Sequence, residues 1–272
     1  MENEVSFLDI FRKGSKTYFY SSLFFPKDVY RDVQVLYAFV RTADDLVDGK
    51  NADINKFNLF WEQYWSQGNK PSEDLIIDSF RQLANEKKFE KNWVRAFEES
   101  MRMDFEDNKY ETLDDTIKYM YGSAEVIGLM MCKIMDVQDK AYPYAQALGR
   151  SMQYANFLRD INEDLGLNRQ YFAVGELKKC KLKSLEYKDV TEDKDNFGKF
   201  ISNQQKYYRE WLDEGRKGYQ YLPKWALRAI KTAEEMYTWT VDEIAANPMV
   251  VYEKKVKPSI GRIISTGIKN SI

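Results

Sequence analysis

Apolar residues recur along this chain at helical spacing rather than in strict alternation. Glycine and proline are scarce, at 13 and 6 of the 272 residues. The pattern predicts an all-α fold with helices over residues 4–13, 16–24, 28–48, 53–67, 72–87, 91–107, 113–136, 139–166, 194–221, 223–246 and 253–270. No segment of convincing length is typical of a β-strand.

The stretch over residues 167–195 is the least periodic part of the chain and predicts a loop with a short helix. It directly follows one of the acidic motifs described next, where a lid would be useful. No linker rich in Pro, Gly or Ser, no repeat and no low-complexity tract divides the sequence. We therefore expect residues 1–272 to form a single helical domain.

Two aspartate pairs with the same spacing lie far apart in the chain, Asp44 with Asp48 and Asp160 with Asp164. Residues i and i+4 project from one helix face, so each pair presents two carboxylates side by side. Such carboxylates repel each other unless something positive lies between them. Mg²⁺ prefers carboxylate and phosphate oxygens, so the pairs are candidate ligands of Mg²⁺, with Mn²⁺ as an alternative.

Three other aspartate pairs share this spacing, so the spacing alone decides nothing; they are Asp28 with Asp32, Asp74 with Asp78, and Asp189 with Asp193. The first of these follows a proline and is expected in the opening turn of a helix, where the helix dipole favours acidic residues. The other two are most simply solvated.

Polar neighbours distinguish the two candidate pairs. At about 100° per residue, Tyr37 and Arg41 fall within roughly 60° of the first pair on an otherwise apolar helix. Gln153 and Asn156 lie within roughly 80° of the second pair in the same way. Each pair therefore completes a polar stripe on an apolar helix.

The absence of histidine excludes several chemistries. Ser-His-Asp and Cys-His catalysis, histidine-ligated zinc or haem, and an imidazole base all require that residue. Cys132 and Cys180 form no C-x-x-C motif and are expected to be structural thiols in a reducing compartment. The net charge of −2 argues against a nucleic-acid partner, and no glycine-rich nucleotide motif is present.

The ends of the sequence bear on location. The N-terminus lacks the order of a signal peptide, and the most apolar run, Val126–Met135, contains Lys133 and is too short to span a bilayer. A cytoplasmic protein is expected. From Tyr252 onward the net charge is +4. This basic end is either an ordinary solvated helix face or a surface for peripheral contact with anionic lipid.

Four blocks of the sequence together resemble the squalene and phytoene synthases, which join prenyl diphosphates head to head. The blocks are SKTYFYSSLFFP, then RDVQVLYAFVRTADDLVD, then MDFEDNKYETL with YMYGSAEVIG, and finally QYANFLRDINEDLGLNRQYF. They occur in the family's order and cover residues 15 to 172. The resemblance implies a single all-α isoprenoid synthase bundle around a deep apolar cavity, with the two aspartate motifs facing each other at its mouth.

The resemblance also implies roles for individual residues. The aspartates at 44, 48, 160 and 164 would hold Mg²⁺ ions that chelate diphosphate. Positions that place or cover the diphosphates are matched by Arg41, Arg159, Arg169, Tyr37, Gln153, Asn156 and Tyr171, with Ser15 and Tyr18 in the amino-terminal block. Two departures stand out, because some relatives have histidine at Gly14 and most have glycine at Glu125.

The implied reaction ionises one prenyl diphosphate, and the double bond of a second attacks the allylic cation. A cyclopropylcarbinyl diphosphate forms, ionises in turn and rearranges to a 1-1′ linked skeleton. The sequence ends by proton loss or by hydride capture from NADPH, which is needed only for squalene. Without histidine, the proton acceptor is the released diphosphate, a water or a tyrosine, with Tyr37, Tyr121 and Tyr171 as unranked candidates.

Several alternatives remain. Residues 44–48 also read D-D-x-x-D, as in chain-elongating prenyltransferases and terpene cyclases, but the second motif has the head-to-head form. Within the family, joining two geranylgeranyl diphosphates to phytoene is favoured. Farnesyl diphosphate as substrate, giving dehydrosqualene, squalene or hydroxysqualene, is the first alternative. A non-catalytic helical assembly module of the same fold is the second, and the oligomeric state stays open.

Overall fold

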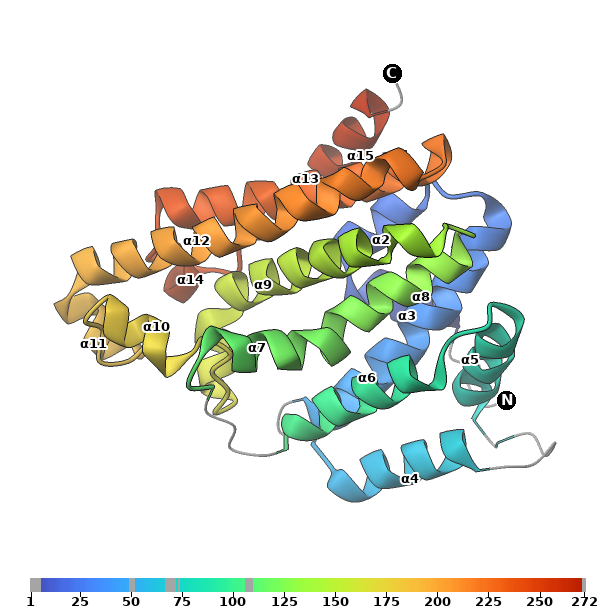
Figure 1. Ribbon diagram of the computed structural model, residues 1–272. Helices are drawn as coiled ribbons and strands as arrows, with labels where there is room; N and C mark the ends of the chain where they lie inside the picture. Colours follow the sequence, from blue (N-terminus) through green and yellow to red (C-terminus); the bar gives the residue numbers. More distant parts are fainter. Residues whose placement is uncertain (1–5, 49–51, 67–71, 73, 106–109, 271–272) are drawn as a thin grey trace.

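The computed structural model describes residues 6–48, 52–66, 72, 74–105 and 110–270 (Figure 1). Within these ranges the chain is helical and has no strand, which confirms the predicted all-α class. The first half contains α1 (Phe7–Gly14), α2 (Lys16–Ser22), α3 (Lys27–Val47), α4 (Ile54–Trp65), α5 (Leu75–Glu86), α6 (Lys91–Met103), α7 (Leu113–Met120) and α8 (Val126–Ile134). The second half contains α9 (Tyr142–Gly166), α10 (Val174–Lys179), α11 (Tyr187–Glu192), α12 (Lys194–Arg216), α13 (Lys224–Ala246), α14 (Val250–Glu253) and α15 (Ile260–Lys269).

Side-chain caps fix where several helices begin. The carboxylate of Asp74 accepts hydrogen bonds from the first backbone amides of α5, and Asp193 caps α12 in the same manner. Thr112 and Asp115 form a capping box at the start of α7. Asp74 and Asp193 were expected to be merely solvated, and their capping role corrects that expectation.

Asp32 also differs from its expectation. Because α3 begins at Lys27, only Asp28 lies in the first turn, and Asp32 is buried one turn further on. Its carboxylate lies 2.8 Å from the ammonium group of Lys87, so it joins α3 to the end of α5 as an ion pair.

The long helix α9 lies at the centre of the bundle, between α12 and α13 on one side and α8 on the other (Figure 1). Buried apolar side chains form two separate clusters around it. One cluster is supplied mainly by α3 to α6 and α8 and includes Phe39, Trp61 and Phe97. The other is supplied mainly by α9 and α12 and includes Phe157 and Tyr208. Tyr18 of α2 packs against both clusters, which places it between them.

A π-helical turn, η2 (Tyr121–Glu125), divides the helix predicted over 113–136 into α7 and α8. Gly122 lies against α6 so closely that a Cβ there would come within 2.0 Å of the carbonyl oxygen of Ala96. Gly128 packs in a similar way, and its Cβ would lie 2.6 Å from the carbonyl oxygen of Ala145 in α9. Small residues thus let three helices approach at this turn.

Two other predicted segments differ from the structure. The stretch 167–195 contains two short helices, α10 and α11, rather than one. The helix predicted over 253–270 begins only at Ile260, after a non-helical segment. Pro258 lies in that segment, and a proline removes a backbone donor and disfavours helix at the residue before it. The two cysteines are buried and unpaired, as expected for structural thiols.

Candidate active site

The two aspartate pairs lie at the ends of two different helices. Asp44 belongs to the last turn of α3 and Asp48 directly follows it, while Asp160 and Asp164 belong to the last two turns of α9. Arg169, from the segment after α9, donates hydrogen bonds to the carboxylate of Asp48 and to the carbonyl oxygen of Val47. The two motifs are therefore joined across the bundle.

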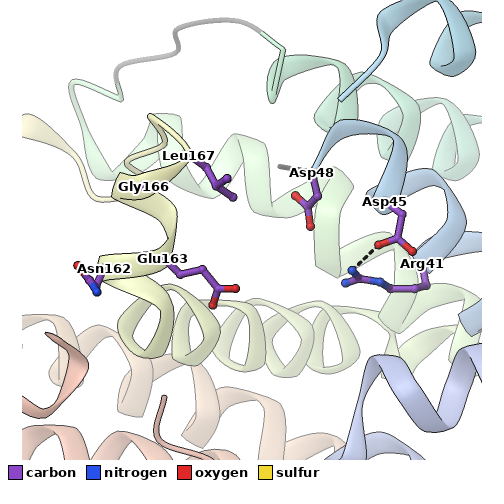
Figure 2. A pocket seen from close by; sticks show the side chains of 7 residues that line it. All are labelled: Arg41, Asp45, Asp48, Asn162, Glu163, Gly166 and Leu167. Atoms are coloured by element: carbon purple, nitrogen blue, oxygen red, sulfur yellow. Dashed lines mark hydrogen bonds and ion pairs between the residues drawn. The ribbon is translucent and has the colours of Figure 1, made fainter. Parts of the chain in front are cut away.

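A cleft of about 540 Å³ opens between these helix ends. It is lined by Arg41, Asp45, Asp48, Asn162, Glu163, Gly166 and Leu167. In Figure 2, Glu163 and Leu167 point from the end of α9 toward Asp48 and Arg41 at the end of α3. The cleft is thus acidic and open to solvent. Asp48 of the first motif lines it directly, and its other wall comes from residues 162–167, the segment of α9 that also carries Asp164.

The first motif carries more negative than positive charge, because three carboxylates, those of Asp44, Asp45 and Asp48, share the guanidinium groups of Arg41 and Arg169. Arg41 lies 3.0 Å from Asp44 and also pairs with Asp45. Partial burial and the neighbouring Asp48 carboxylate nevertheless raise the pKa of Asp44 to about 7, despite the guanidinium of Arg41. Neutralising this pair fully would require a further cation.

The second motif shows the same imbalance. Asp160 accepts a hydrogen bond from Arg159 Nε at 2.8 Å and lies 3.1 Å from Lys255 Nζ. Burial works against ionisation of Asp160, but these two cations outweigh it and lower the pKa of the carboxyl group. Burial and the charge of Asp160 raise the pKa of Asp164 well above its usual value. In each motif, therefore, one carboxyl group has a raised pKa despite the nearby arginine, Asp44 in the first motif and Asp164 in the second.

These donors fit Mg²⁺. No group of three or more acidic or cysteine side chains gathers closely enough to hold a metal within the described parts of the chain. Mg²⁺, however, is usually held by one or two carboxylates together with substrate phosphates rather than by a protein cage. Paired carboxylates with uncompensated charge, at two helix ends that approach each other, suit that mode of binding.

Tyr18, Tyr37 and Ser15 belong to the amino-terminal part of the fold; Tyr37 is electrostatically coupled to Arg41, and Tyr18 to Arg159. The ring of Tyr37 lies 4.4 Å from that of Phe11, and Tyr18 donates a hydrogen bond to Met152 Sδ at 3.7 Å. Ser15 Oγ accepts from the Tyr18 amide at 3.2 Å, so Ser15 acts here as the N-cap of α2. A Cβ on Gly14 would come within 2.3 Å of the Tyr37 hydroxyl, so any larger residue there would require the Tyr37 side chain to shift.

The polar residues of α9 continue the site away from the second motif. Gln153 accepts a hydrogen bond from Asn156 at 3.3 Å, and both are partly exposed. Tyr237 of α13 lies beside them through its contact with Tyr18, at 5.7 Å between ring centroids. Nothing in the sequence blocks marked Tyr237, because α13 lies outside the four motifs.

The tyrosines near the cleft only partly match the prediction. Tyr171 is buried, and its hydroxyl donates to Asp104 at 3.0 Å. Tyr121, another candidate proton acceptor, is 38% exposed on η2, and its role stays a prediction. The buried tyrosine of that block is Tyr119, whose hydroxyl also donates to Asp104, at 2.9 Å.

Glu125 turns away from the cleft. It is only 2% exposed, and it accepts hydrogen bonds from Arg150 Nε at 2.7 Å and from Gln146 at 3.3 Å. The guanidinium of Arg150 lies 5.5 Å from the ring of Trp211 in α12. The carboxylate is therefore part of the contact between η2, α9 and α12 rather than a free charge.

Known proteins resemble this chain over most of its length. The chloroplastic phytoene synthase 1 of Arabidopsis thaliana is 27% identical over 256 residues, which cover 89% of this chain and 59% of that relative. The chloroplastic phytoene synthase 2 of Solanum lycopersicum is 27% identical over 248 residues, covering 86% of this chain and 78% of the relative. The chain therefore spans about three fifths of the length of the first relative.

Solved structures share the fold. A crystal structure of a dehydrosqualene synthase in complex with a ligand has a TM-score of 0.87 at 20% identity, covering 97% of this chain and 93% of that one. The squalene synthase of Alicyclobacillus acidocaldarius has a TM-score of 0.74 at 19% identity, covering 90% and 92%. The family model described as squalene/phytoene synthase matches residues 11–262. The chain belongs to the squalene/phytoene synthase family.

Proposed function

We propose that this protein is a prenyltransferase that joins two prenyl diphosphates head to head through a cyclopropylcarbinyl diphosphate. The observation that carries the proposal is the approach of the two aspartate pairs to each other. Arg169 pairs with Asp48, both of these residues act electrostatically on Asp164, and an arginine lies against each motif. Two carboxylate pairs and their arginines suit a substrate with two negatively charged diphosphates. We further propose that residues 1–272 act as a single domain.

The aspartate pairs would hold Mg²⁺, which supplies positive charge to the departing diphosphate when bound. The guanidinium groups of Arg41, Arg159 and Arg169 now pair with carboxylates on both sides of the cleft. Guanidinium binds phosphate oxygens in the same two-pronged geometry. We expect these arginines to take up diphosphate oxygens and so to stabilise the charge that develops as the C–O bond breaks.

The prenyl chains would lie between the two apolar clusters. Tyr18, which packs against both clusters, marks that position, and Met152 beside it is only partly buried. The cavity expected there remains a prediction, as does its depth. Cavity depth would set the accepted chain length, so the C20 substrate rests on the likeness to phytoene synthases.

The deciding experiment incubates purified protein and Mg²⁺ with C15 or C20 prenyl diphosphate, with and without NADPH, and identifies hydrocarbons by mass spectrometry. We expect a C40 product from the C20 substrate without NADPH, together with Mg²⁺-dependent release of diphosphate. The Asp48→Asn variant provides the background. A C30 product from the C15 substrate alone would contradict the phytoene assignment and favour the farnesyl alternative. No C30 or C40 product would leave the assembly-module alternative.

We also propose that the protein is cytoplasmic and contacts membranes peripherally through α15. No helix within the described residues is both long and apolar enough to cross a bilayer. Ile260, Ile264 and Ile268 are nevertheless exposed along one stripe of α15, with Ile268 58% exposed. Residues 254–270 contain five basic side chains and no acidic one. An apolar stripe on a basic segment suits an anionic lipid surface, which would also take up a hydrocarbon product.

Vesicle sedimentation tests this surface. Replacing Ile264 by glutamate should weaken binding to vesicles with about one third phosphatidylglycerol by tenfold or more, because it removes one isoleucine that would enter the lipid and adds a negative charge. Leu59→Glu is the matched control, since Leu59 of α4 is 54% exposed far from the basic segment. Equal losses in both variants, or equal binding of the parent protein to neutral vesicles, would contradict the proposal.

A further inference from the structure

The carboxylate of Asp104, directly after α6, accepts hydrogen bonds from two tyrosine hydroxyls. Tyr119 of α7 donates at 2.9 Å and Tyr171 donates at 3.0 Å, and the two hydroxyl oxygens lie 3.5 Å apart. Three segments far apart in the chain therefore meet at one acidic group.

The surroundings of Asp104 make it a carboxylate that can take up a proton. Removal from water raises its pKa to about 6, although Arg169 and the two hydroxyls act in the opposite direction. The negative charge of Asp48 also contributes to this raised pKa. Among the described residues, Asp44 of α3 and Tyr110 also interact electrostatically with Asp104.

Tyr171 is the member of this group that is electrostatically coupled to the second motif, through Asp164. Its ring stacks on Phe157 at 4.3 Å with an angle of 11°, and its carbonyl oxygen accepts from Thr116 at 2.8 Å. The ring is therefore held by Phe157, and the backbone of the same residue is held by Thr116. Arg169 and Asp164 both act on the ionisation of its hydroxyl, which places that hydroxyl near the two motifs.

A neutral tyrosine hydroxyl is a poor base by itself, because accepting a proton would leave a positively charged oxygen. It accepts a proton readily only when it passes its own proton to a second base at the same time. The hydrogen bond from Tyr171 to Asp104 already points that proton at a carboxylate. The absence of histidine from the sequence leaves few other side chains for this task.

We infer that Asp104 is the positioning residue and final proton acceptor for proton removal through Tyr171, an inference that rests on the proposed function. In the step that closes the cyclopropane ring, a C–H bond at C1 of one substrate breaks, and its electron pair forms the ring bond. The proton passes to the Tyr171 oxygen, and the Tyr171 proton passes to the carboxylate of Asp104. No oxidant or further reactant is needed.

Asp104→Asn tests the inference, because an amide keeps the shape but cannot take the proton. We expect turnover to fall by about 100-fold with KM nearly unchanged. A substrate deuterated at C1 should show a larger isotope effect in this variant than in the parent protein, because proton removal becomes slower. A purely structural loss would not change the isotope effect.

Asp32→Asn is the matched control. Asp32 is also a shielded carboxylate in a polar contact, but it lies about 18 Å along α3 from the first motif. We expect its turnover and isotope effect to match those of the parent protein. Circular dichroism before each assay shows whether either variant has lost its fold.

Tyr171→Phe, alone and combined with Asp104→Asn, separates a relay from two independent effects. If both groups serve one proton transfer, the double variant should be no slower than the slower single variant. Multiplying losses, an unchanged isotope effect, or a raised KM with unchanged turnover would each overturn the inference. If the parent protein released no diphosphate with Mg²⁺, the proposed function would fail instead, independently of Asp104.

Discussion

Asp48→Asn and Asp164→Asn should each lower turnover of prenyl diphosphates by about a thousand-fold or more while leaving the helical circular dichroism signal unchanged. A carboxylate that helps hold Mg²⁺ contributes several kcal/mol to stabilising the departing diphosphate, and each 1.36 kcal/mol corresponds to a factor of ten. In the free protein Asp48 pairs with Arg169 at a solvent-facing helix end. The fold should therefore survive its replacement.

The control for these variants has the same spacing in a different setting. Asp28 lies exposed in the first turn of α3, far from the cleft, so Asp28→Asn should change turnover less than twofold. The turnover of all three variants is compared by measuring steady-state rates of diphosphate release. Losses of similar size in all three would contradict the distinction between a metal-binding pair and an ordinary acidic helix start.

Gly122→Ala should destabilise the protein by about 3 kcal/mol, the upper end of the usual cost of overpacking. The added methyl group would lie 2.0 Å from both the Ala96 carbonyl oxygen and Ser100 Oγ, and backbone cannot move aside as a side chain can. Ser100 also donates a hydrogen bond to the carbonyl oxygen of Tyr119 at 3.0 Å, so the clash falls next to the Asp104 group. Urea unfolding followed by circular dichroism measures the loss.

Gly198→Ala provides the matched control for Gly122→Ala. Gly198 lies inside α12, and a methyl group added there would meet no neighbouring atom within 4 Å, so alanine should stabilise the helix by up to about 1 kcal/mol. Opposite signs for the two variants would show that close packing at η2, and not helix propensity, decides the first result. Two shifts of the same sign would contradict this explanation.

Much of the architecture follows from local pattern. Helices such as α3 and α9 have long apolar faces with clear ends, so their extents were predicted within a few residues. The π-turn was not predicted, because the small residues around Gly122 fit regular helical spacing as well as they fit a widened turn. The break before α15 carried a signal in Pro258, which an otherwise periodic basic segment obscured.

The residues of the candidate site also divide into those that could be predicted from the sequence and those that could not. The aspartate pairs and Arg41 could be found from spacing on one helix, because their relation is local. Asp104 could not, because an acidic residue at a helix end is ordinary until its partners are known. Those partners lie 15 and 67 residues away in sequence, and only the packing of α6, α7 and the segment after α9 brings them together.

The π-turn has a consequence for how this chain tolerates changes of length. Removing one residue from Tyr121–Glu125 would let this turn become a regular α-helix with α8 almost in place, because a π-turn closes over one residue more than an α-turn. Gly128 would then still face Ala145. A deletion within α8 itself has no such slack, because everything beyond it would rotate by about 100° and shift by about 1.5 Å. The π-turn is therefore the position between α7 and α8 at which this chain should best tolerate the loss of one residue.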